Sequence, residues 1–335
     1  MSERVLVTGA TGFLGGAVVA DLASRGYTVV ASGRDRRRGE ALARQTGARF
    51  VAADLGRAVD VDRIVAGVDA IVHSGALASP WGRARDFERA NVRGTVHIVD
   101  AAERAGVRRL VHISTPTLYF DYRDHLDVAE DHPIGAPVND YVRTKIAAER
   151  VVLSARTRGM RATILRPRAL FGPGDRNILP RVIRGLERGV FPIFGEGRNL
   201  VDLTYIDDAA QAVRLALVRA GSGTYNITSG EPRRLSDLLG QLAHALGVRP
   251  PRIRISYANA LRIARGLEVT HALLAPDREP LLTRYTVGLL ATTLTLDLSA
   301  ARRDLDYQPL VGVDEGVRRF LAHHRGRHSE NWRSS

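Results

Sequence analysis

A glycine-rich turn near the N-terminus constrains the fold more than any other feature of the chain. The sequence Thr8-Gly9-Ala10-Thr11-Gly12-Phe13-Leu14-Gly15 follows a β-branched run and opens a segment with helical spacing of apolar residues. Its three glycines allow a tight turn, close approach of the backbone to a pyrophosphate, and close packing of the helix on the sheet. Free N–H groups at the start of the helix then favour an anion. The turn predicts a dinucleotide site rather than a purely structural turn.

Short strands alternate with helical segments through the first half of the chain. We expect strands at residues 4–8, 28–32, 49–52, 70–73, 110–113 and 162–165. This alternation is typical of βαβ units, so the expected fold class is α/β, with a doubly wound parallel Rossmann sheet. Ligands of such sheets bind beyond the carboxyl ends of the strands.

The second half of the chain is less regular. Beyond Gly172, prolines interrupt shorter elements, and this predicts a smaller, mostly C-terminal substrate-binding lobe. We expect residues 1–172 to form the dinucleotide-binding Rossmann domain, with residues 200–220 returning to it. The lobe would comprise residues 173–199 and 221–322, and residues 323–335 would form a flexible basic tail.

Composition excludes several classes of protein. The 335 residues include no cysteine, which excludes disulfide frameworks, thiolate metal sites and cysteine nucleophiles. The N-terminal residues lack the pattern of a secretory signal, and the longest apolar stretch, 287–296, is too short for a transmembrane span. We therefore expect a cytoplasmic protein.

The formal net charge of +13 would ordinarily suggest a nucleic acid or an anionic membrane as partner. Lys145 is the only lysine, however, and the arginines are scattered without interleaved aromatic residues. We expect no nucleic-acid partner. The polar residues between His125 and His132 predict a solvated loop rather than a ligand cluster, and we expect no metal.

The residues after the second and third predicted strands bear on the choice of dinucleotide. A site that prefers NAD carries an acidic residue after the second strand, whereas this chain has Arg34 there. An arginine neutralises a 2′-phosphate, so Arg34 favours NADP(H), with NAD(H) as the alternative cofactor. Asp54 and Leu55 follow the third strand, where adenine would need an acceptor; a helix cap is the alternative role of Asp54.

Tyr141 and Lys145 form a second pattern that indicates chemistry. Their spacing places both side chains on one face of a helix. A fixed ammonium favours phenolate, so it should lower the tyrosine pKa and make the phenol a usable proton donor and acceptor. Because arginine replaces lysine everywhere else, the lysine at this position favours a functional pair over a chance pair on an exposed helix.

With these two motifs the chain resembles the extended short-chain dehydrogenase/reductase superfamily over essentially its whole length. The resemblance implies that Tyr141 and Lys145 are the catalytic pair, that Thr115 is the catalytic hydroxyl with Ser114 as the alternative, and that Asn91 supports a relay. It implies a homodimer and further cofactor contacts at Ser74, Gly75, Ala76, Ser114, Arg166 and Pro167.

At two positions this chain departs from the patterns of other branches of the superfamily, and these differences bear on the choice of substrate. Pro116-Thr117 stands where sugar dehydratases carry an acid pair. Val201 stands where many nucleotide-sugar epimerases carry an arginine that holds the substrate's diphosphate, although Arg198 could compensate.

Other segments resemble a different branch. Residues 195–205, 280–285 and 301–309 resemble the 3β-hydroxysteroid dehydrogenases, and residues 78–82 resemble the 2-alkyl-3-oxoalkanoate reductases of that branch. The branch implies a bulky, largely apolar ketone or 3-oxo substrate, with contacts expected at Trp81, Thr117, Arg168 and Tyr205. The helix expected at 257–274 either covers an apolar pocket or lies on the surface of the lobe.

The expected function is an NADP(H)-dependent ketoreductase or alcohol dehydrogenase that acts on a small molecule through a Thr-Tyr-Lys mechanism. Two alternatives remain open on the sequence. One is an NAD-dependent nucleotide-sugar epimerase, and the other is a non-catalytic dinucleotide-sensing protein.

Overall fold

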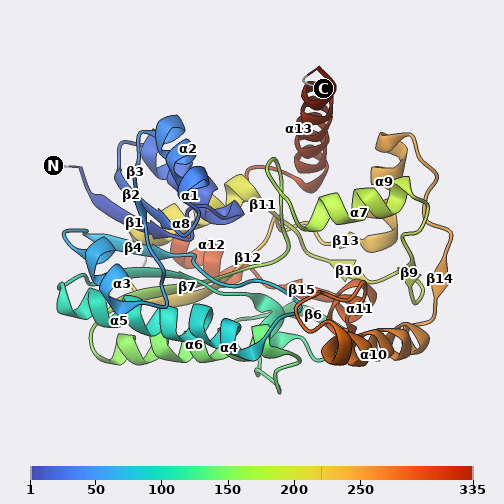
Figure 1. The fold of residues 1–335 in the computed structure, drawn as a ribbon, viewed down its shortest axis with the longest axis horizontal. Coiled ribbons are helices and arrows are strands. Elements are labelled where there is room, and N and C mark those ends of the chain that lie inside the picture. The colour runs from blue at the N-terminus through green and yellow to red at the C-terminus, as the bar shows by residue number, and fades with distance from the viewer. Residues whose placement is uncertain (1, 220, 334–335) are drawn as a thin grey trace.

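Seven parallel strands form the central sheet, in the order β3-β2-β1-β4-β5-β7-β12 (Figure 1). The computed structural model describes residues 2–219 and 221–333, with side chains through Gly326. The strands are β1 (Arg4–Thr8), β2 (Thr28–Gly33), β3 (Arg49–Ala52), β4 (Ala70–His73), β5 (Arg109–Ile113), β7 (Arg161–Pro167) and β12 (Gly223–Ile227). This is the doubly wound Rossmann arrangement that the sequence predicts.

Helices cover both faces of the sheet (Figure 1). Val5 and Val7 of β1 pack into the core on one face, whereas Leu6 packs into the core on the other, because successive strand residues point to opposite sides. One face carries α1 (Phe13–Ser24), α2 (Arg36–Thr46), α8 (Ile206–Arg219) and α12 (Ser299–Leu305). The other carries α3 (Ala58–Val65), α5 (Gly94–Arg104) and α6 (Asp140–Thr157).

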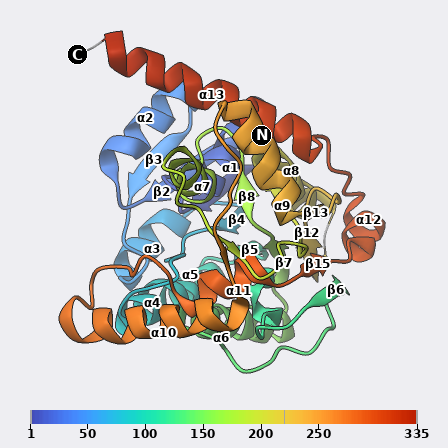
Figure 2. The ribbon, with the colours of Figure 1, turned by 90° about the vertical axis from the view of Figure 1, so that its right-hand side faces the viewer.

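Within the part of the chain that the structure describes, the lobe contains three small sheets and four helices. The strands are β6 (His125–Val128), β8 (Leu170–Phe171), β9 (Ile193–Phe194), β10 (Leu200–Val201), β11 (Thr204–Tyr205), β13 (Arg233–Arg234), β14 (Arg254–Ile255) and β15 (Leu294–Leu296). The helices are α7 (Ile178–Glu187), α9 (Leu235–Leu246), α10 (Tyr257–Leu274) and α11 (Arg284–Ala291), and they lie on the right-hand side of Figure 1, the side that faces the viewer in Figure 2. No helix in the described part of the chain has both the length and the apolar character needed to cross a membrane.

Two segments show how the chain passes between the main sheet and the lobe. Residues 223–227, assigned to the lobe, form β12 and complete the edge of the main sheet, because their backbone pairs with the exposed edge of β7. Of the two strands within 200–220, β10 pairs with β13 and β15 and β11 pairs with β8, whereas α8 packs on the main sheet.

The C-terminal segment forms the helix α13 (Val313–Arg333), which projects from the body of the protein (Figures 1 and 2). Val313, Val317 and Phe320 anchor its first turns in the core. Residues 323–333, expected to form a flexible tail, continue this helix, since no proline interrupts it after Val313. Residues 334–335 of that tail lie outside the described part of the chain.

Candidate active site

The glycine turn lies at the carboxyl end of β1, packed against the segment that follows β4. Gly9 has a φ of +67°, and a Cβ there would lie 2.7 Å from the backbone nitrogen of Gly75. A Cβ at Gly15 would lie 2.2 Å from the carbonyl oxygen of Gly9. Side chains at these two positions are therefore excluded by the backbone itself.

The start of α1 fits a pyrophosphate. The helix begins at Phe13 after Gly12, which supplies no side-chain cap, and its first turn carries no acidic residue. Its leading N–H groups are free to bind an anion and lie at the positive end of the helix dipole. Thr11 lies against Gly33 at the end of β2, while Leu14 is buried in the core.

Arg34 and Asp54 lie beyond β2 and β3. Arg34 is exposed and makes no ion pair with any described residue, so its charge remains available to a ligand. Asp54 is less free, because its carboxylate accepts a hydrogen bond of 2.9 Å from the Gly56 backbone and pairs with Arg89. The local turn thus uses part of the acceptor capacity that adenine would need.

Helix α6 places Tyr141 and Lys145 at the same edge of the sheet. The helix starts at Asp140 because the Asn139 side chain accepts a hydrogen bond of 2.8 Å from the Val142 backbone. Lys145 Nζ donates to the carbonyl oxygen of Ile113 at 2.7 Å. Burial lowers the pKa of Lys145 to about 8.

The predicted lowering of the Tyr141 pKa by Lys145 is wrong. Burial raises the pKa of Tyr141, the nearby Tyr285 phenol raises it further, and a hydrogen bond with Thr115 opposes the shift. The Lys145 ammonium donates its hydrogen bond to Ile113 and is not among the groups that shift the pKa of the Tyr141 phenol. The groups of the protein therefore keep Tyr141 protonated at neutral pH.

Three other hydroxyl-bearing side chains lie around Tyr141, and we refer to the four together as the hydroxyl cluster: Thr115, Thr117, Tyr141 and Tyr285. Thr115 caps the 3₁₀ turn after β5 (Pro116–Tyr119) and Thr117 lies within it, with 2.9 Å between their Oγ1 atoms. Tyr285, on α11, forms a hydrogen bond with Thr117. The sequence pattern did not single out Tyr285 as a site residue.

Thr115, the hydroxyl expected to act in catalysis, forms a hydrogen bond with Tyr141. The alternative, Ser114, is buried, and its Oγ has no hydrogen-bond partner among the described residues. Its backbone N–H pairs with Leu165 at 2.7 Å, which holds it between β5 and β7.

The side chain of Asn91 forms hydrogen bonds with the backbone of the loop after β4. It lies on a π-helical turn (Glu88–Arg93) between α4 (Ala84–Phe87) and α5. Its side-chain oxygen accepts from the Leu77 N–H at 2.7 Å, and its amide nitrogen donates to the Leu77 carbonyl oxygen at 3.2 Å and to Thr144 Oγ1 at 3.0 Å. Asn91 therefore connects the loop after β4 to the residue that precedes Lys145.

Arg166, expected at the cofactor, has its guanidinium in a buried ion pair. Its Nε and Nη2 donate to the two carboxylate oxygens of Glu149 at 2.9 and 2.6 Å, and Nη1 donates to the Tyr119 hydroxyl. Glu149 lies one helical turn after Lys145, so this pair fixes α6 against β7. The four-residue spacing of Tyr141, Lys145 and Glu149 was the signal that could have identified Glu149.

The expected substrate residues lie in three different places. Thr117 belongs to the hydroxyl cluster, and Arg168 is buried beside Tyr285. Trp81 lies farther out, and its indole N–H donates to the Pro276 carbonyl oxygen at 2.9 Å, which links the loop after β4 to the lobe. Tyr205 does not join them, since it is buried against Phe171 in the main core.

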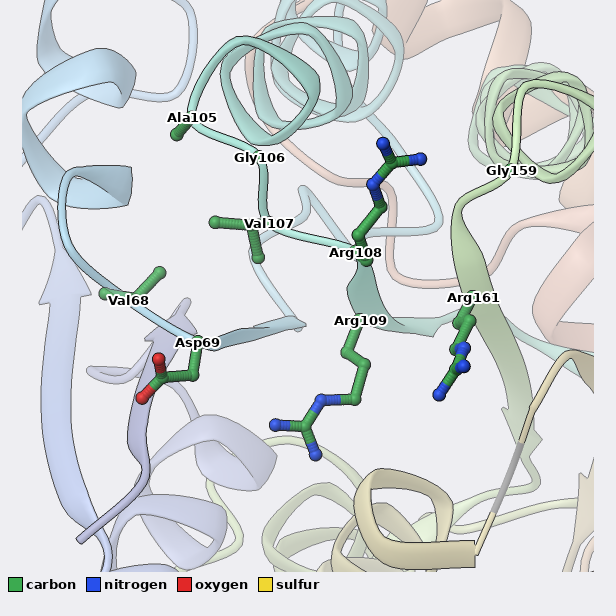
Figure 3. Close-up of a pocket in the computed structure, with 9 residues that line it drawn as sticks. All are labelled: Val68, Asp69, Ala105, Gly106, Val107, Arg108, Arg109, Gly159 and Arg161. Atoms are coloured by element: carbon green, nitrogen blue, oxygen red, sulfur yellow. The ribbon is translucent and has the colours of Figure 1, made fainter. Parts of the chain in front are cut away.

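Figure 3 shows a hollow at the opposite edge of the sheet, before the amino ends of β4, β5 and β7. It is lined by Val68, Asp69, Ala105, Gly106, Val107, Arg108, Arg109, Gly159 and Arg161. Asp69 accepts from the Arg4 backbone N–H, and Arg109 pairs with Glu3. Because the glycine turn and the hydroxyl cluster lie at the carboxyl edge, this hollow is separate from the candidate active site. Among the described residues, no three His, Asp or Glu side chains are grouped to hold a metal ion.

The chain is similar to known proteins over most of its length. The profile of the NAD dependent epimerase/dehydratase family matches residues 5–228. The 2-alkyl-3-oxoalkanoate reductase of Stenotrophomonas maltophilia is 36% identical over 330 residues, which cover 95% of this chain and 98% of that protein. The 3beta-hydroxysteroid-dehydrogenase/decarboxylase isoform 1 of Arabidopsis thaliana is 32% identical, over 84% of this chain and 68% of that protein.

A solved structure supports the same relationship. MoeE5 in complex with UDP-glucose and NAD superposes with a TM-score of 0.78 at 25% sequence identity, over 97% of this chain and 99% of that chain. These similarities confirm the resemblance inferred from the glycine turn and from the Tyr141–Lys145 pair.

Proposed function

Because the chain belongs to the NAD dependent epimerase/dehydratase family and is a nicotinamide-dependent oxidoreductase, we propose that it reduces a bulky, largely apolar 3-oxo compound with NADPH. The observation that carries this proposal is the hydroxyl cluster at the same sheet edge as the glycine turn. The bound dinucleotide supplies the hydride.

In this proposal Tyr141 donates its hydroxyl proton to the oxygen of the ketone, and Thr115 donates a hydrogen bond to that oxygen. A raised Tyr141 pKa supports the direction of reduction, because the phenol then carries its proton at neutral pH. Lys145, anchored on Ile113, would bind the ribose of the dinucleotide, and Tyr141 would regain a proton from solvent.

The epimerase alternative lacks a charged anchor for a diphosphate at position 201, where it would be expected. Val201 is buried in an apolar cluster with Ile193 and Leu239, so it offers no charge. Arg198, the residue that could compensate, is 83% exposed and pairs with Glu196. This arrangement favours an apolar substrate over a sugar nucleotide.

The proposal is tested by following nicotinamide absorbance with NADPH or NADH and a set of 2-alkyl-3-oxo compounds, with UDP-glucose and UDP-glucuronate as the competing substrates. We expect NADPH oxidation with the oxo compounds alone. Conversion of a sugar nucleotide without net change in absorbance would instead support the epimerase.

A further inference from the structure

Tyr285 reaches the hydroxyl cluster from the lobe, on the first turn of α11. Thr283 caps this helix, because its hydroxyl accepts a hydrogen bond of 3.1 Å from the Thr286 backbone. The Tyr285 ring packs edge-on against Phe120, with 6.0 Å between the ring centroids, and only 9% of the residue is exposed. The fold therefore holds the Tyr285 phenol in one place at the site.

A chain of hydrogen bonds joins the four members of the hydroxyl cluster. At one end Tyr285 forms a hydrogen bond with Thr117, and Thr117 Oγ1 lies 2.9 Å from Thr115 Oγ1. At the other end Thr115 forms a hydrogen bond with Tyr141. Thr115 Oγ1 also accepts a hydrogen bond of 3.3 Å from the Thr117 backbone N–H. Because each hydroxyl has one proton to donate, the direction of one bond constrains the direction of the next.

The charge of Arg168 favours one direction at the Tyr285 end of the chain. Burial raises the pKa of Tyr285, so the phenol keeps its proton at neutral pH. The Arg168 guanidinium acts on this phenol, and a cation attracts the phenol oxygen and repels the hydroxyl proton. The buried Asp202 carboxylate interacts with Arg168 and stabilises the cation there. The Tyr285 proton therefore faces Thr117 and not Arg168.

The count of donors and acceptors carries this direction to Tyr141. When Thr117 accepts the Tyr285 proton, it donates its own to Thr115 Oγ1, the side-chain oxygen 2.9 Å away. Thr115 Oγ1 then accepts twice, from the backbone N–H and from the hydroxyl of Thr117. Its own proton is left for the oxygen of Tyr141. The Tyr141 proton is consequently not used within the cluster and stays available to a ligand.

We propose that Tyr285 is a positioning residue, which orients the hydrogen bonds of the cluster so that Tyr141 presents its proton to the substrate oxygen. Without a donor at Tyr285 the chain can run the other way, and Tyr141 then donates its proton to Thr115. When a ketone is bound, the Thr115 proton turns to the ketone oxygen, so both hydroxyls donate to one atom. This inference rests on the proposed function and gives a residue of the lobe a role in it.

The first test removes single hydroxyls and follows ketone reduction by NADPH. We expect Tyr285→Phe, which keeps the ring on Phe120, and Thr117→Val each to lower kcat about 5- to 10-fold, the effect of one lost hydrogen bond, with KM unchanged. Thr117→Ser, which keeps the hydroxyl, should recover most of the activity that Thr117→Val loses. Tyr122→Phe is the matched control, because Tyr122 packs on the same Phe120 ring and lies outside the hydroxyl cluster.

A double variant distinguishes a chain from two independent contacts. Because Tyr285→Phe and Thr117→Val interrupt the same chain, the protein with both substitutions should lose no more activity than either single variant. Losses that multiply in the double variant would overturn the proposal. A raised KM with kcat unchanged in Tyr285→Phe would also overturn it and make Tyr285 a substrate contact.

A measurement without substrate keeps the inference testable if no ketone is reduced. The nine tyrosines are labelled with ¹³C at the ζ carbon, which carries the hydroxyl, and the loss of one signal in Tyr141→Phe identifies Tyr141. We expect the Tyr141 signal to shift in Tyr285→Phe and in Thr117→Val, and to stay in place in Tyr122→Phe. A shift without ketone reduction would support the chain and contradict the proposed reaction alone. An unmoved signal in Tyr285→Phe and Thr117→Val would overturn the chain itself.

Discussion

Lys145 Nζ donates a hydrogen bond of 2.7 Å to the carbonyl oxygen of Ile113, the last residue of β5. This contact fixes the ammonium at the carboxyl edge of the sheet, one helical turn from Tyr141. Because the side chain is 3% exposed, the protein holds a charge where water cannot solvate it. The cost of that charge can be measured.

Stability should therefore rise with pH. The pKa of Lys145 is about 8 in the folded protein and 10.5 ordinarily. Between these two pH values the unfolded chain binds more protons than the folded protein, so the free energy of unfolding increases as the pH rises. We expect the free energy of unfolding to be about 2 kcal/mol higher at pH 9.5 than at pH 7.5 from this group. Denaturant titrations of wild type and Lys145→Met measure it, and an undiminished rise in the variant would refute the assignment.

Replacement of Tyr141 by Phe should remove the proton donor without disturbing the dinucleotide. We expect kcat to fall by about 10²- to 10⁴-fold, the range for loss of a general acid. Affinity for NADPH, measured by calorimetry, should stay near the wild-type value. Tyr27→Phe, a partly buried tyrosine beside α1, serves as the control. Comparable losses of turnover and affinity would mean that Tyr141 holds the cofactor instead.

The sequence predicts most strands of the Rossmann sheet because they are short, rich in β-branched residues and, apart from β3, largely buried. The sequence does not predict strand β12, because this strand depends on pairing with β7, about 60 residues earlier in the chain. The sequence does not identify Tyr285 as a site residue for a similar reason, since only the folded chain brings it close to Tyr141. The spacing of Tyr141 and Lys145 predicts their common face but not the effect of burial on the phenol.

Adjacent glycines in the first helix should respond in opposite ways to alanine. A Cβ at Gly15 would meet the Gly9 carbonyl oxygen at 2.2 Å, whereas at Gly16 the nearest contact, Ala10 O, is 3.4 Å away. We expect Gly15→Ala to cost about 1–3 kcal/mol of stability and Gly16→Ala to gain about 0.5–1 kcal/mol as a better helix former. Thermal unfolding and dinucleotide titration of both variants test this, and equal stabilities would contradict the packing described for the turn.

Arg34 is expected to set the preference for NADPH. Its exposed, unpaired charge suits a 2′-phosphate, so Arg34→Ala should weaken NADPH binding by about 10- to 100-fold and leave NADH binding unchanged. Arg44→Ala, which removes an exposed arginine from the last turn of α2, is the matched control. Equal affinity of the wild type for NADPH and NADH would mean that Arg34 does not select between the two dinucleotides.

The most direct test of the central claim follows the hydride itself. The protein is incubated with NADPH deuterated at the transferred position of the nicotinamide and with a 2-alkyl-3-oxo compound, and the product is analysed by mass spectrometry. We predict an alcohol with one deuterium on the former carbonyl carbon, in an amount equal to the NADPH consumed, and no such product from Tyr141→Phe. An unlabelled product, or turnover of UDP-glucose alone with the dinucleotide unchanged, would contradict the account.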